Sequence, residues 1–197
     1  QTAADDYSIT VHPAAQALFS TCQSKFDEVL DNHIVQLLQK VAYNENESLE
    51  QVILRDACYQ ALGLSYDTCF ANIPFESWLS TFFLPDLNQK NRQHFMILSR
   101  RIAWLLGRWV TRITDECRPT VYQILMKLME DEDLVIQMTA ADGLSKIIDD
   151  LNFDIAPFAS YVPICIRLLF QLLEKCHEVP SKMQLINNLA IIIDQAH

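Results

Sequence analysis

Apolar residues recur every three or four positions along most of the chain, which is the spacing of amphipathic helices and not of strands. The clearest case is the segment from Ser99 to Val110, SRRIAWLLGRWV, in which arginines fall between the apolar positions. This pattern predicts a helix at the centre of the chain. Its buried stripe is expected to hold Leu98, Ile102, Leu105, Leu106, Trp109 and Ile113.

The same register returns along the chain at regular intervals. Aligned on their leucine, the pairs LG at 62, LG at 106, LS at 144 and LA at 189 are separated by 44, 38 and 45 residues. Helical-pair repeats have periods of about 40 to 47 residues. We therefore predict an all-α fold, an α-solenoid of about four and a half helical-hairpin repeats in one continuous segment, 1–197. The approximate repeats are 13–43, 48–88, 92–130, 133–176 and 179–197, the last one partial.

Local signals predict helix boundaries and packed faces within these repeats. A break near Asp27 is expected to divide the first hairpin, and Ser48 is a good N-cap for the next helix. One helix is predicted from Ile155 to Cys176. A strong amphipathic stripe at i, i+3, i+4, i+7 and i+8 is formed by Phe75, Trp78, Leu79, Phe82 and Phe83.

The most apolar run, Ile155 to Leu173, has two possible interpretations. A membrane span needs about 20 apolar residues with few interruptions. Arg167 and two prolines interrupt this run, so we favour a helix buried between neighbouring repeats.

Composition supports a large helical core and narrows the choice of partners. Half of the residues are apolar, while only three are glycine and seven proline. The net charge of −10 disfavours nucleic acid and anionic membrane surfaces, because both are themselves negative. A partner with basic segments is more plausible.

The charge is divided unevenly along the chain. Residues 1–86 hold 3 basic and 12 acidic side chains, residues 87–114 hold 6 and 0, and residues 115–197 hold 6 and 13. The basic block contains Lys90, Arg92, Arg100, Arg101, Arg108 and Arg112. It could contact an acidic ligand, but we favour mutual neutralisation between stacked helices. Arg108 lies one turn from Trp104 and could contact that ring, which is expected to be partly exposed.

Two acidic clusters flank one predicted helix, Leu134 to Asp150. Glu130, Asp131, Glu132 and Asp133 precede it, where carboxylates favour the positive end of the helix dipole. Asp149 and Asp150 end it, where the dipole does not favour them. Capping and solubility explain the first cluster, whereas a docking surface for a Lys/Arg-rich segment would explain both. Both interpretations stay open, and these acids with Trp104 and Arg108 are the candidate protein-binding residues.

The sequence contains no constellation typical of an enzyme. Six cysteines (22, 58, 69, 117, 165 and 176) form no CxxC pair and are expected to be free thiols. Cys176 and His177 are neighbours that point about 100° apart on a helix, so a core thiol beside a surface imidazole is expected. No phosphate loop, zinc pattern or serine nucleophile motif appears, so we predict no catalytic residue, no metal and no cofactor.

Local runs in this register resemble HEAT repeats and, in their details, nuclear transport receptors of the importin-β superfamily. The resemblance extends from about Asp6 to the end of the chain. Its marks are RDACY at 55–59, LGL at 62–64, RRIAWLLGRW at 100–109, RP at 118–119, DEDLV at 131–135 and LLFQLL at 168–173. At the position where HEAT repeats often carry an arginine, this chain has Arg55, Ser99, Gln137 and Lys182, so a continuous ladder between repeats is not expected.

The resemblance implies a receptor that binds Ran-GTP through other repeats, contacts nucleoporins and carries protein cargo along a superhelical arch. It would shuttle between cytoplasm and nucleus, with no chemistry, nucleic acid or membrane insertion. A start at Gln1 without Met suggests a middle piece of such a protein. The alternative is a HEAT scaffold subunit of another complex, such as a phosphatase or a vesicle coat.

Overall fold

The computed structural model describes residues 11–65 and 75–195, apart from the side chains of His12 and Asp27. Every regular element in these residues is helical, which confirms the all-α prediction. The elements are α1 (Val11–Lys40), α2 (Leu49–Leu64), α3 (Phe75–Trp78), the π-helical turn η1 (Leu79–Phe83), α4 (Leu84–Leu87), α5 (Arg92–Leu106), the 3-10 turn η2 (Val110–Arg112), α6 (Arg118–Met129), α7 (Leu134–Ile148), α8 (Ile155–Phe158), α9 (Val162–Lys175) and α10 (Val179–Gln195).

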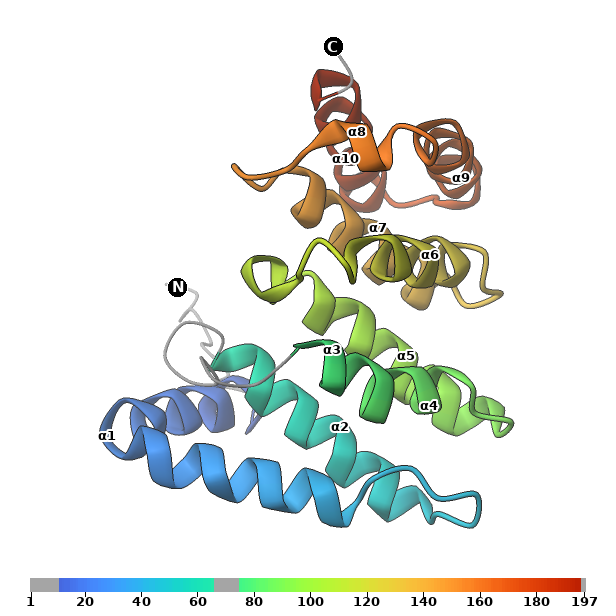
Figure 1. Cartoon of the computed structure of the whole chain (residues 1–197). Helices are drawn as coiled ribbons and strands as arrows, with labels where there is room; N and C mark the ends of the chain where they lie inside the picture. The colour runs from blue at the N-terminus through green and yellow to red at the C-terminus, as the bar shows by residue number, and fades with distance from the viewer. Residues whose placement is uncertain (1–10, 66–74, 196–197) are drawn as a thin grey trace, which may run out of the picture.

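The helices form an α-solenoid that rises from α1 at one end to α8, α9 and α10 at the other (Figure 1). One layer is continuous, because α2 packs on α5, α5 on α7 and α7 on α10. In the second layer α4 packs on α5, α6 on α7 and α9 on α10. Each helix of the continuous layer therefore contacts neighbours far away in sequence as well as its own partner.

The core lies between the two layers and matches the predicted stripes. Phe75, Trp78, Leu79, Phe82 and Phe83 are all buried along the run from α3 through η1. The six apolar residues expected on the central stripe are buried as well. For these two stripes the apolar periodicity correctly predicts the buried residues, whereas Leu18, Phe26, Leu54 and Ile186, which the same periodicity places on packed faces, are exposed.

The central helix is shorter than the pattern predicts. It ends at Leu106, and the N–H groups of both Arg108 and Trp109 donate to the Leu105 carbonyl oxygen at 2.9 Å. Trp109 and Ile113 thus lie beyond α5, although both are buried. The prediction that they continue the helical stripe is wrong, because a chain that folds back over the core can bury them without a helix.

Glycines allow the close approach of α5 and α7 where the central helix ends. A Cβ placed on Gly107 would lie 2.7 Å from the Gly143 Cα, and one on Gly143 would lie 2.7 Å from the Ala103 carbonyl oxygen. Both distances are shorter than van der Waals contact. The two glycines are therefore required by the packing of these helices.

Two other predicted boundaries can be compared with the structure. The break near Asp27 corresponds to a kink inside α1, where Phe26 has non-helical φ and ψ. The single helix predicted from Ile155 to Cys176 is wrong, since α8 and α9 are separated by a turn before Pro163. Proline lacks an N–H and would remove a hydrogen bond inside a helix, but it is tolerated in the first turn, where Pro163 lies in α9.

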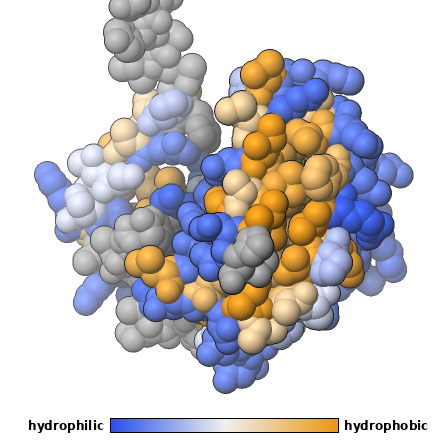
Figure 2. Space-filling model, turned by 90° about the horizontal axis from the view of Figure 1, so that it is seen from above, coloured by the Kyte–Doolittle hydropathy of each residue, from blue (hydrophilic) through white to orange (hydrophobic). Residues whose placement is uncertain are grey.

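The end of the stack at α9 and α10 carries an apolar patch. Seen from above, this patch stands out against the hydrophilic surface around it (Figure 2). The exposed apolar side chains of these two helices are Ile164, Phe170, Val179, Met183, Ile186 and Ile193. Among the described residues, no helix combines the length and the apolar character that a membrane crossing requires.

Candidate protein-interaction surfaces

The acidic loop, which we define as residues 130–133, connects α6 to α7 and has a structural role. The Asp133 carboxylate accepts a hydrogen bond from the Ile136 N–H at 3.0 Å and caps α7. Asp131 accepts from the Arg92 guanidinium at 2.8 Å, and this contact lowers the pKa of Asp131. Two of the four acids are thus engaged within the chain, as the capping interpretation expects.

The other two acids of the loop face solvent. Glu130 lies 3.6 Å from the Arg167 guanidinium in a pair whose side chains are both more than half exposed. Such a pair contributes little binding energy in water. Glu132 is exposed beside it. The acidic loop therefore presents negative charge to a partner mainly through Glu130 and Glu132.

Asp149 and Asp150 do not extend this surface. They follow the last turn of α7, while the acidic loop precedes its first turn. A helix of 15 residues separates the two clusters by roughly 22 Å. Asp149 is exposed, and the Asp150 carboxylate accepts a hydrogen bond from the Asn152 N–H at 2.9 Å. The two acidic clusters belong to opposite edges of the stack.

Trp104 is partly exposed, as the sequence predicts, but its cationic neighbour is a different arginine. The Arg101 guanidinium carbon lies 5.3 Å from the ring centroid of Trp104. Arg108 instead donates to the Gly63 carbonyl oxygen of α2 at 3.4 Å. Both Trp104 and Arg108 thus take part in the contact between α2 and α5.

The basic block is partly neutralised by neighbouring helices. Arg101 contacts Asp56 of α2 at 2.7 Å, and Arg92 contacts Asp131 in the acidic loop between α6 and α7. These contacts confirm mutual neutralisation for the two arginines. Arg100 and Lys90 are exposed.

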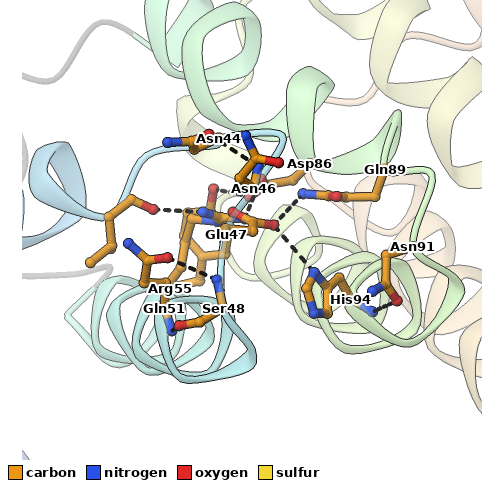
Figure 3. Close-up of polar contacts among 12 residues, drawn as sticks. Asn44, Asn46, Glu47, Ser48, Gln51, Arg55, Asp86, Gln89, Asn91 and His94 are labelled. Atoms are coloured by element: carbon orange, nitrogen blue, oxygen red, sulfur yellow. Dashed lines mark hydrogen bonds and ion pairs between the residues drawn. The ribbon is translucent and has the colours of Figure 1, made fainter.

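Arg55 of α2 is a fully buried charged residue, and its polar contacts lie among the side chains drawn in Figure 3. Its guanidinium contacts Glu47 at 2.8 Å and Asp86 at 3.0 Å, and it donates to the Val41 carbonyl oxygen at 2.6 Å. Tyr59 donates its hydroxyl to Asp86 at 2.6 Å. We name this set, Val41, Glu47, Arg55, Tyr59 and Asp86, the Arg55 node.

The node connects α1, α2 and α4. Val41 follows α1, Arg55 and Tyr59 belong to α2, and Asp86 belongs to α4. Glu47 extends the network to α5, because its carboxylate accepts from Gln89 at 2.6 Å and lies 3.6 Å from the His94 Nδ1. Figure 3 shows these side chains converging on Glu47 from separate segments.

Burial sets the protonation behaviour of the node. It raises the pKa of Asp86 to about 6, although the charge of Arg55 and the hydrogen bond from Tyr59 oppose that rise. Burial and the nearby Asp86 charge raise the pKa of Tyr59 well above its usual value. A buried pair of this kind fixes geometry more than it adds stability.

Gln137 of α7 has the role that Arg55 has in α2. Its side-chain amide donates to the Met129 carbonyl oxygen at 3.1 Å, at the end of α6, and to that of Asp131 at 2.6 Å. Arg55 likewise ties its helix to the carbonyl that follows α1. The sequence places both residues at one repeat position, but only the structure reveals that each one anchors the preceding connection.

Polar contacts between successive repeats recur at similar sequence separations, from 39 to 47 residues. Hydrogen bonds join Gln89 to Glu47, Arg92 to Asp131, Arg101 to Asp56, Trp109 to Leu62 and Gln184 to Asp142, over 42, 39, 45, 47 and 42 residues respectively. The same range describes the steps of the sequence register. Each contact therefore links equivalent regions of neighbouring units.

The described residues contain no arrangement that suggests catalysis. No group of three or more potential metal ligands occurs among them. Cys176 is buried while His177 is exposed, as predicted for a core thiol beside a surface imidazole. The five cysteines in the described part of the chain are free, and Cys69 lies outside it.

Known proteins with similar sequences are nuclear transport receptors. No protein-family model matches the chain. It is 28% identical over 199 residues to importin-11 of Mus musculus and equally to that of Homo sapiens, covering 100% of this chain and 20% of each relative. It is 24% identical over 197 residues to the importin beta-like protein KAP120 of Saccharomyces cerevisiae, covering 98% of this chain and 19% of that protein.

A solved structure supports the fold independently. The structure of Lph2, a bidirectional nuclear transport receptor in S. cerevisiae, superimposes with a TM-score of 0.84 at 24% identity. The match covers 94% of this chain and 19% of that one. The chain spans about one fifth of the length of the proteins that it resembles.

Proposed function

We propose that the chain is a HEAT-repeat segment of an importin-β-type receptor and that its parent carries protein cargo into the nucleus in a Ran-GTP-dependent cycle. The segment contributes repeats to the cargo-binding superhelical arch. The observation that supports this role is similarity to importin-11 along the entire segment. A generic repeat scaffold explains the helical period but not a likeness of this extent.

The proposed mechanism is coupling between two ligands on a flexible solenoid. Small changes at successive contacts between repeats add up to a change of curvature. Ran-GTP bound to other repeats would alter that curvature and release cargo. The two binding sites would thus be coupled, and each ligand would lower the affinity of the protein for the other. The contacts between α2, α5, α7 and α10 are the part of this path within the chain.

The acidic loop supplies the surface that a basic cargo segment would meet. Glu130 and Glu132 face solvent there, and the net charge of −10 favours a basic partner over nucleic acid or an anionic membrane. Complementary charge raises association rates and selects against acidic partners. Nucleoporins and Ran-GTP are the other partners of the parent, which shuttles between cytoplasm and nucleus.

The first experiment measures the affinity of the full-length parent for Ran in its GTP and GDP forms. We expect strong preference for the GTP form, with displacement of bound cargo. Equal or absent binding would contradict the transport cycle and leave a HEAT scaffold of another complex, for which stable partners would then be sought.

A second experiment tests the acidic loop. Glu132→Lys in the full-length parent is expected to weaken binding of a basic cargo at low salt, and the effect should shrink as salt rises. Glu76→Lys on α3 is the control, because Glu76 is also exposed to solvent but lies on another helix. Glu132 is preferable to Asp131 or Asp133, whose replacement would also remove the contact to Arg92 or the cap of α7.

A further inference from the structure

A groove next to the acidic loop has an apolar floor. We name it the α7–α10 groove, because it lies between the first turns of α7 and α10, beside the connection from α9 to α10. It encloses about 460 Å³, and Leu134, Val135, Met138, Glu178, Ser181 and Gln184 are among its lining residues. This volume lies within the range of sites that hold small ligands or a few side chains.

The floor of the groove is unusually exposed for apolar side chains. Leu134 is 41% exposed and Val135 is 53% exposed. Both come from the first turn of α7, where the fold itself does not need them, since α7 packs on its neighbours through Ile136, Ala140 and Leu144. Exposed apolar side chains that line a concavity with a polar rim are typical of an interaction site.

Two exposed carboxylates come from the connections that flank this groove. Glu178 lines the groove itself, and Glu132 belongs to the acidic loop, two residues before the lining residue Leu134. Lys175 is the one lysine or arginine among the lining residues of the groove. Glu132 and Glu178 are both exposed. The groove thus combines an apolar surface with carboxylates from two connections. Glu132 comes from the connection between α6 and α7, and Glu178 comes from the connection between α9 and α10.

We propose that the α7–α10 groove binds a short protein segment in which a large aliphatic side chain is flanked by lysine or arginine. The aliphatic side chain lies on Leu134 and Val135, and the basic residues reach Glu132 and Glu178. This inference rests on the proposed function, because it specifies which basic segments the acidic loop accepts. Charge alone would accept any basic segment, whereas the apolar floor selects those that carry an anchor.

The test uses the full-length protein and fluorescein-labelled peptides at low salt. One peptide has two leucines between two blocks of three Lys/Arg residues, a second replaces the leucines by serines, and a third keeps the leucines but replaces the basic residues by glycine and serine. We expect the first peptide to bind about tenfold more tightly than the second, and the third to bind weakest.

Val135→Ser tests the floor, and Ile53→Ser on α2 is its matched control, since both side chains are 53% exposed in the wild-type chain. Circular dichroism and thermal unfolding establish that both variants fold. Val135→Ser is expected to weaken the affinity for the leucine peptide about tenfold and to leave the affinity for the serine peptide unchanged. Ile53→Ser should change neither.

Several results would overturn the proposed ligand of the groove, and each would point to a different alternative. Equal affinity for the leucine and serine peptides, both weakened by Glu132→Lys, would leave the acidic loop as a purely electrostatic surface and keep the proposed function intact. Tight binding of the uncharged leucine peptide would exclude a basic partner. Self-association of the protein that Val135→Ser abolishes would identify a second copy as the occupant. Failure of every peptide to bind would refute both the groove and the acidic docking surface, whereas the measurement with Ran would still test the transport cycle.

Discussion

The Arg55 guanidinium donates a hydrogen bond to the Val41 carbonyl oxygen at 2.6 Å and so ties α2 to the end of α1. Its other contacts are Glu47 and Asp86, two carboxylates that are themselves buried. One side chain therefore satisfies a backbone carbonyl and two negative charges at the joint between hairpins. This arrangement makes the joint sensitive to any change in charge.

Removal of Arg55 should destabilise the chain strongly. Arg55→Met leaves two buried carboxylates without their cation, and the breaking of a buried pair from one side costs about 3–5 kcal/mol. Urea unfolding followed by circular dichroism measures the loss. Arg100→Met is the control, because Arg100 is exposed on α5, and its effect should stay within about 0.5 kcal/mol. Similar losses in the two variants would contradict the role of the node.

Gln137→Met should cost less than Arg55→Met. It leaves two carbonyl oxygens, those of Met129 and Asp131, without a donor. The desolvation cost of unsatisfied neutral groups is about 1–3 kcal/mol. The same unfolding measurement ranks the two variants, and the opposite order would show that charge is not what distinguishes the two positions.

Asp86 should make the folded state less stable as pH rises. Burial raises its pKa from 3.8 to about 6, so the folded chain holds a proton there that the unfolded chain has already lost. Its contribution is therefore fully present below pH 4 and is lost as pH rises through 6. Between these values the free energy of unfolding of the wild type should fall by about 1–3 kcal/mol relative to that of Asp86→Asn. A constant difference between the two proteins over this pH range would contradict the raised pKa.

Gly143→Ala should destabilise the contact between α5 and α7. Alanine favours a helix over glycine by about 1 kcal/mol, but its Cβ would lie 2.7 Å from the Ala103 carbonyl oxygen. Overpacking of this kind costs about 1–3 kcal/mol, so we expect a net loss of stability. Thr139→Ala on the same helix is the comparison, since Thr139 is partly exposed. A stabilised Gly143→Ala protein would show that the two helices can separate at little cost.

The pair of Arg101 and Asp56 should couple more strongly than that of Arg92 and Asp131. The side chains of the first pair are 16% and 19% exposed, whereas Arg92 is 46% exposed. Water and salt screen an exposed pair more effectively, and such pairs contribute about 0.2–1 kcal/mol. Double-mutant cycles with alanine at low and high salt measure both coupling energies. Coupling of equal size and equal salt dependence would show that burial at this level does not matter.

The all-α class of the fold, most of its buried apolar positions and the likeness to transport receptors could be predicted from local sequence patterns. Apolar periodicity indicates which residues are buried, because a helix presents the same face to its neighbours at every turn. For that reason the stripe from Leu98 to Ile113 was predicted correctly as buried. The same periodicity could not reveal that α5 ends at Leu106, since Trp109 and Ile113 reach the core after the chain has left the helix.

Which charges are available to a partner depends on long-range packing, and local patterns do not reveal it. Glu130, Asp131, Glu132 and Asp133 look equivalent in the sequence, yet Asp131 is bound by Arg92, which lies 39 residues earlier. Arg101 and Arg108 stand three residues before and four residues after Trp104, and both spacings suit a contact with its ring. In the structure Arg101 lies over the ring, whereas Arg108 donates to Gly63 of α2, 45 residues earlier. Local sequence fixes which side chains share a helix face, whereas long-range packing chooses their partners, and the physical reason is that such partners come from repeats about 40 residues apart.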